Sequence, residues 1–86
     1  MWVGRMVNVT STSSFRSALG GEKELELEAS TIRELLNVLV ARYPSMQRHL
    51  DEGIAIAIEG EIYRDNWDTV IPAESEVFLM PRIKGG

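Results

Sequence analysis

Hydrophobic residues recur along the chain at two different spacings, which separate candidate strands from a candidate helix. Residues 3–10 are rich in β-branched side chains, and leucines alternate with glutamates in residues 23–28, so both segments are predicted strands. From residue 31 to residue 43 the spacing changes to the roughly 3.6 residues of a helix. The apolar stripe of this helix consists of Ile32, Leu35, Leu36, Leu39, Val40 and Tyr43.

Both ends of the main helix carry sequence signals. Thr31 and Glu34 have the spacing of a capping box, in which each side chain satisfies a free backbone N–H, and Ser30 is an alternative cap. Pro44 stops the helix after Tyr43. The helix is therefore expected to span residues 31–43.

Two segments outside these elements are predicted to have less regular structure. Residues 11–21 are polar and end in paired glycines, which is typical of a mobile loop, with Phe15 and Leu19 spaced to anchor it on the core. A further short turn is expected to follow at Met46. His49, in that turn, is interpreted as a surface residue and is assigned no role.

Three further strands are predicted in the second half of the chain, at residues 53–59, 61–63 and 76–80. The first of them places three isoleucines on one face and two small alanines on the other. The chain therefore supplies five strands for one sheet.

The last strand is apolar on both faces. Val77 and Leu79 point one way, and Phe78 and Met80 point the other. Because one helix covers only one face of a sheet, the second face is either a small core under loops or an exposed binding patch. The pattern alone favours neither, and Phe78 and Met80 are the candidate patch residues.

Composition and charge exclude several classes of function. The 86 residues are enough for one domain, and 9 Lys and Arg against 13 Asp and Glu leave a net charge of −4, which disfavours nucleic acid as a partner. The sequence has neither an apolar stretch near bilayer-spanning length nor the layout of a signal peptide, so we expect a cytoplasmic protein without a membrane partner.

Side chains suited to catalysis or metal binding are scarce. Cysteine is absent and there is one histidine, which excludes thiolate nucleophiles, zinc ribbons, Cys-ligated clusters and multi-histidine metal sites. The glutamates of residues 23–28 alternate along a strand and do not converge on one ion, so no metal site is expected.

The sequence ends in Gly85 and Gly86, after a predicted domain of residues 1–80 and a flexible tail of residues 81–86. Glycines without side chains can enter a channel too narrow for other residues and present the α-carboxylate to another protein. That carboxylate has a reference pKa of about 3.3–3.7, so it is ionised at neutral pH and can attack an activated phosphorus. A frayed chain end is the alternative interpretation.

Several segments together resemble one family. Residues 76–86 are similar to an acidic-Val-x-apolar-apolar-Pro-Pro-Val-Ala-Gly-Gly terminus, while Phe15-Arg16, residues 31–36 and Tyr43-Pro44 resemble that family's other conserved elements. The chain is identified by this resemblance with the small β-grasp sulfur-carrier proteins, typified by the small subunit of molybdopterin synthase and the thiazole-synthesis sulfur carrier. Arg82 and Lys84 make its tail bulkier and more basic than the family pattern.

The resemblance implies an α+β, ubiquitin-like β-grasp fold, with a mixed sheet packed on one main helix and the last strand in its centre. It implies that an E1-like activating enzyme uses ATP to adenylate Gly86, which a sulfur donor converts into a thiocarboxylate. Gly85, Lys84, Ile83, Arg82 and Pro81 would thread into the partner, and Phe78 and Met80 would dock on it. The protein would be a subunit without a tightly bound cofactor, and its catalytic partner would be the molybdopterin synthase large subunit.

Other outcomes of the same activation remain open. A ubiquitin-like modifier would pass the activated Gly86 to a target lysine instead of to sulfur. A sulfur carrier could also serve thiazole formation or tRNA thiolation, and the final acceptor, molybdenum or tungsten chemistry included, is not determined by the sequence. A plain β-grasp interaction module is the third class.

Overall fold

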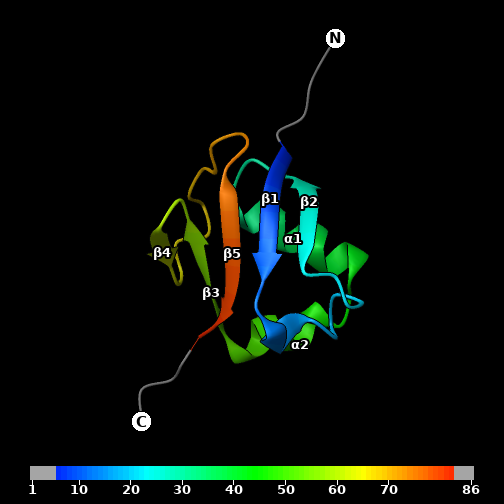
Figure 1. Cartoon of the computed structure of the whole chain (residues 1–86). Helices are drawn as coiled ribbons and strands as arrows, with labels where there is room; N and C mark the ends of the chain where they lie inside the picture. The colour runs from blue at the N-terminus through cyan, green and yellow to red at the C-terminus, as the bar shows by residue number, and fades with distance from the viewer. Residues whose placement is uncertain (1–5, 83–86) are drawn as a thin grey trace.

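The computed structural model describes residues 6–82, whose five strands form one mixed sheet (Figure 1). In chain order the elements are β1 (Met6–Ser11), a 3₁₀ turn η1 (Ser13–Phe15), β2 (Glu24–Glu28), α1 (Ile32–Arg42), α2 (Met46–Glu52), β3 (Ile54–Ile58), β4 (Glu61–Tyr63) and β5 (Glu76–Pro81). Figure 1 shows α1 behind the sheet and α2 beside one end of it.

The strand order in the sheet is β2-β1-β5-β3-β4, which places the last strand in the centre. β1 and β2 form an antiparallel hairpin, while β5 runs parallel to β1 and antiparallel to β3. A mixed sheet of this order packed on one main helix is the ubiquitin-like β-grasp fold. The predicted fold class and the central position of the last strand are confirmed.

The core lies between the sheet and α1, and alternation along each strand determines which side chains enter it. Leucines on β2 and isoleucines on β3 are buried, whereas the glutamates of β2 are exposed. From the helix, the buried residues are Ile32, Leu35, Leu36 and Leu39, and the two remaining residues of the predicted stripe are half-buried. Hydrophobic burial of this single layer is the main stabilising contribution.

The beginning of α1 shows the predicted cap with one change. The Glu34 backbone N–H donates to Thr31 Oγ1 at 3.1 Å, as in a capping box. The Glu34 side chain reaches back to the N–H of Ser30 at 2.6 Å, one residue earlier than the standard motif. Two free donors at the helix start are therefore satisfied by side chains.

We expect Thr31→Ala to lower the free energy of unfolding by about 0.5–2 kcal/mol, because the Glu34 N–H then loses its acceptor. Urea unfolding followed by circular dichroism measures the change. Thr31→Ser keeps the hydroxyl and should stay within about 0.5 kcal/mol of the wild type. Equal midpoints for the alanine and serine variants would contradict the assignment of the cap.

The segment of residues 11–21 is more closely integrated than the predicted loop. Its anchors are confirmed, since Phe15 is 1% exposed and Leu19 is fully buried. The Leu19 N–H donates to Phe15 O at 3.0 Å, and further short-range bonds continue to Gly21. Local turns of this kind satisfy the backbone while both side chains enter the core.

The interpretation of His49 as a surface residue is corrected by its surroundings. Its ring is half-buried and lies edge-on to Phe15, with ring centroids 4.9 Å apart and an interplanar angle of 76°. Because α2 packs beside η1, His49 covers the aromatic anchor of the core. It has a packing role in the described structure.

Candidate functional site

The face of the sheet opposite α1 is open, and its β5–β3–β4 half is apolar. Phe78 is 45% exposed and Ile62 is 58% exposed, and both pair with Ala57, which lies between them. Met80, one pair further along β5, is half-buried opposite Ala55. The second apolar face is therefore an exposed patch and not a small core, with Phe78 and Met80 on it. We call these five residues the sheet patch.

The sheet patch contains residues that the sequence analysis did not select. Ile62 belongs to a three-residue strand, and only its pairing with Ala57 on β3 shows that it extends the same surface. Arg64 follows that strand and lies beside the patch. Alternation within residues 61–63 was the available signal, but it does not specify which neighbouring strand they join.

The patch has a hollow at the end where the tail begins. It measures about 210 Å³ and is lined by Ala55, Ile62, Arg64, Met80, Pro81 and Arg82. The small side chain of Ala55 makes the depression because its neighbours Met80 and Ile62 are larger. We call this depression the tail-base groove.

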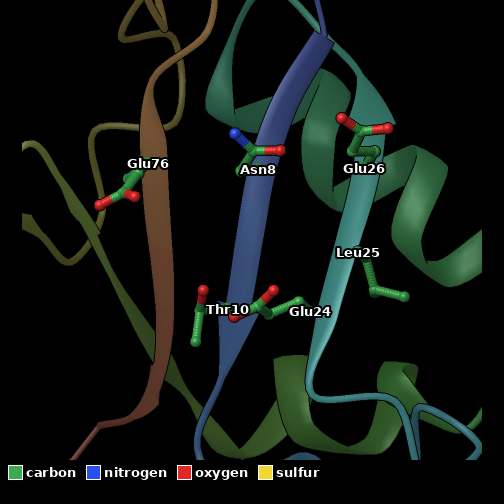
Figure 2. Close-up of a pocket in the computed structure, with 6 residues that line it drawn as sticks. All are labelled: Asn8, Thr10, Glu24, Leu25, Glu26 and Glu76. Carbon is green, nitrogen blue, oxygen red and sulfur yellow. The ribbon is translucent and has the colours of Figure 1, made fainter.

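The other half of the open face is polar and acidic, as Figure 2 shows. Asn8 of β1 lies opposite Glu26 on one side and Glu76 on the other, and a broad depression of about 520 Å³ covers this region. Thr10 and Glu24 also line it. The glutamates of β2 are exposed, as their alternation predicted.

The base of the tail is held by the residue that ends α2. The Arg82 N–H donates to Gly53 O at 3.1 Å, and Gly53 itself has φ +106°, a conformation that favours glycine. A Cβ on Gly53 would lie 3.5 Å from both Cβ and Cδ of Arg82, so the arginine side chain packs over this glycine. The direction in which the chain leaves the sheet is thus defined by backbone pairing as far as Arg82.

The predicted tail of residues 81–86 is only partly described. Pro81 is the last residue of β5, opposite Ile54, so it belongs to the sheet. Ile83, Lys84, Gly85 and Gly86 lie outside the described residues.

On β4, Tyr63 alternates with Ile62 and packs against the core, on the side of the sheet opposite the sheet patch. The Tyr63 hydroxyl donates to Glu61 Oε1 at 2.8 Å, and this hydrogen bond raises the pKa of Tyr63, with desolvation and the charge of Glu61 acting in the same direction.

Within residues 6–82, no set of three or more His, Asp or Glu side chains is arranged to hold a metal ion. None of the helices in that range is long and apolar enough to cross a membrane. The arrangement is suited to binding another protein while directing a chain end toward it.

These features together define a small protein of the ubiquitin-like β-grasp class, with an exposed apolar sheet face beside its central strand β5. The ThiS family model matches residues 12–86, and the chain belongs to the ThiS family. The family expected from the sequence is confirmed. Carriers of this type work with partner enzymes and are not catalysts by themselves.

Solved structures show the same fold. The small archaeal modifier protein 1 (SAMP1) from Methanosarcina acetivorans has a TM-score of 0.80 and 24% identity, over 99% of this chain and 100% of that one. The putative molybdopterin converting factor subunit 1 from Pyrococcus furiosus has a TM-score of 0.77 and 22% identity, over 92% and 99%.

A third similar structure is a complex. It contains subunits 1 and 2 of the molybdopterin-converting factor from Helicobacter pylori 26695, and the match has a TM-score of 0.68 and 22% identity, over 94% of this chain and 99% of that one. Among curated proteins, none matches the sequence.

Proposed function

We propose that this protein carries sulfur as a thiocarboxylate on Gly86. The observation that supports this most is the ThiS family match, which extends through Gly85 and Gly86. In the proposed reaction a Gly86 carboxylate oxygen attacks the α-phosphorus of ATP, releasing pyrophosphate and leaving an acyl-adenylate. Sulfide then attacks the carbonyl carbon and AMP departs, which leaves the thiocarboxylate. An E1-like activating enzyme performs both steps, in the cytoplasm.

The described residues account for the carrier's own part in this reaction. The chain has no cysteine, so the sulfur has no competing thiol acceptor within the same molecule. The sheet patch supplies apolar area for docking, with Phe78 and Met80 on its β5 side next to the start of the tail. The bond between Arg82 N–H and Gly53 O fixes where the chain end starts, which reduces the conformational entropy lost when the remaining residues enter a partner's channel.

The acceptor that we propose is the pterin precursor of the molybdenum or tungsten cofactor, with the protein acting as the small subunit of molybdopterin synthase. Support comes from the two similar structures described as molybdopterin converting factor subunits, one of them in complex with its second subunit. Thiazole formation and tRNA thiolation are alternatives that use the same thiocarboxylate.

A second candidate is a ubiquitin-like modifier, favoured by the similarity to a small archaeal modifier protein and by a basic residue, Lys84, before the diglycine. It shares the adenylation step, but a target lysine attacks Gly86 in place of sulfide. Denatured extracts of native cells separate the two functions, because only a modifier leaves covalent conjugates of higher mass.

The intact mass of the protein isolated from its native cells tests the proposal directly. We expect a species heavier by the difference between one sulfur and one oxygen, located at Gly86 by fragmentation. Incubation with ATP, sulfide and an extract of those cells should increase that species, and omission of ATP is the control. If the mass stays unmodified under these conditions, the sulfur-carrier proposal is wrong.

A further inference from the structure

The outer edge of β2 has no neighbouring strand and carries a row of carboxylates (Figure 1). Glu24, Glu26 and Glu28 are exposed, and none of their carboxylates forms an ion pair with another side chain of residues 6–82. An unpaired strand edge is a template on which another strand can add. We call the outer side of these three residues the acidic edge.

The backbone of the acidic edge points away from the sheet. The Ser11 N–H donates to Lys23 O at 3.0 Å, so Lys23 directs its backbone groups toward β1. Successive residues of a strand direct theirs to opposite sides, which turns the N–H and C=O groups of residues 24, 26 and 28 outward. Glu26 O accepts a bond from Arg42 Nη1 at 3.5 Å, a donor from outside the sheet. The edge is therefore accessible to further backbone pairing.

Charge determines which strand can add to this edge. A second β2 strand is disfavoured, because antiparallel pairing of two acidic edges places glutamates opposite glutamates. A complementary strand needs basic residues at alternate positions, which lie on one face when the chain is extended. The sequence has a single pair of basic residues two positions apart, Arg82 and Lys84 in its own tail.

The tail cannot reach the acidic edge of its own chain. Asn8 pairs with both Glu26 and Glu76, so these two glutamates lie at the same height in the sheet. Arg82 is six residues beyond Glu76, which is about 20 Å further along the strand direction. Lys84 lies two residues beyond Arg82, a reach of at most about 7 Å. The basic pair can meet the acidic edge only on a second copy of the chain.

We propose that the acidic edge of one copy binds the tail of a second copy as an added strand. Lys84 of the second copy lies opposite Glu26, and its Arg82 side chain reaches Glu28 on the same face. This proposal goes beyond the proposed function and does not depend on it. A tail held in this way is covered, so self-association competes with any enzyme that takes up Gly86.

The antiparallel direction is favoured by the charges at the two ends of β2. It places Gly86 opposite Glu24, so that the terminal carboxylate lies beside the exposed Lys23. A parallel strand would bring the same carboxylate toward Glu28. The pairing joins an edge on one copy to a tail on another, and it leaves the bond between Arg82 N–H and Gly53 O intact.

Sedimentation velocity of the full chain at low ionic strength tests the association. The weight-average mass should rise between about 10 μM and about 1 mM protein, and added salt should reverse the rise. Glu26→Lys and Lys84→Glu should each weaken association about tenfold, because an attractive pair becomes a repulsive one. The double variant Glu26→Lys/Lys84→Glu should recover most of the loss.

The matched control is Asp65→Lys, at an exposed position just beyond β4 at the opposite edge of the sheet. Like Glu26→Lys it raises the net charge by two, from −4 to −2. It should change the association constant less than about twofold, because its site lies outside the paired strands. Thermal unfolding checks that every variant is folded, and Lys84→Glu tests the pairing without any change to the sheet.

Carbodiimide cross-linking identifies the contact itself. This reagent joins a lysine amine to a carboxylate in direct contact with it, with loss of one water. Lys23 and Lys84 are the two lysines of the sequence. In a mixture of ¹⁴N and ¹⁵N copies we expect a Lys84–Glu26 cross-linked peptide that carries both isotopes.

Three results would overturn the inference. The first is a protein that stays monomeric up to about 1 mM. The second is association that survives Glu26→Lys, or that the double variant does not restore. The third is a set of Lys84 cross-links that omits residues 24–28. Each result leaves the thiocarboxylate proposal unaffected, because self-association requires neither ATP nor an activating enzyme.

Discussion

Deletion of Gly86 is expected to abolish thiocarboxylate formation while leaving the fold intact. The carboxylate would then belong to Gly85, one residue short of the position that the proposed reaction presents to ATP. An extended chain that is one residue shorter reaches roughly 3.3–3.6 Å less far, which holds the terminal carboxylate oxygen well beyond near-attack distance from the α-phosphorus of ATP. Intact mass after incubation with ATP, sulfide and native extract gives the yield, which should fall below detection.

The matched control for this deletion is Lys84→Gln, which keeps the length and the diglycine but removes the charge. It should still be modified, with at most a modest increase in KM. Both variants should unfold at the wild-type temperature. A deletion variant that still becomes thiocarboxylated would show that Gly86 is not the attachment site.

Phe15→Ala is expected to lower the free energy of unfolding by about 3–5 kcal/mol, the largest stability effect that we predict. Phe15 is 1% exposed and its ring contacts His49, so its removal leaves a cavity between η1 and α2. For a domain of this size, each kcal/mol corresponds to a shift of about 4–8 °C in Tm. Calorimetry or urea unfolding measures the loss, and a change below about 1 kcal/mol would disprove the core role of residues 11–21.

The chain provides its own control, because its second phenylalanine lies on the open face. Phe78→Ala should cost about 1 kcal/mol or less, since 45% of the residue's surface is already exposed to water and no core cavity is left. It should instead raise the apparent KM for modification, because the sheet patch loses its largest side chain. Phe15→Ala is therefore expected to lower stability strongly, whereas Phe78→Ala is expected to weaken partner binding with little loss of stability.

Much of the fold is predictable because local patterns and tertiary packing agree in it. The leucines of residues 23–28 and the stripe of α1 are periodic, and the Thr31–Glu34 signal produces the observed cap. The buried anchors at Phe15 and Leu19 also follow from spacing. By contrast, the contact of His49 with Phe15 joins residues 34 positions apart, so no local pattern predicts it.

The residues of the candidate site likewise fall into two groups, those that the sequence pattern identifies and those that only the tertiary structure places there. Phe78 and Met80 are recognisable because a strand with two apolar faces must expose or cover one of them, but whether that face is covered depends on the placement of every other element. Arg64 and Ile62 enter the site only through the pairing of β4 with β3. The attachment of Arg82 to Gly53 likewise requires the end of α2 to lie beside the end of β5.

The sequence by itself determined the periodic elements, the family and the diglycine on which the proposed chemistry depends, because each is written in neighbouring residues or in a short motif. The tertiary structure alone decided that the second sheet face is exposed, that it has an acidic and an apolar-basic half, and that a groove with two arginines lies at the tail base. The physical reason is that exposure and charge complementarity are properties of surfaces. A surface is assembled from strands distant in the chain, and strand order is not encoded in any one of them.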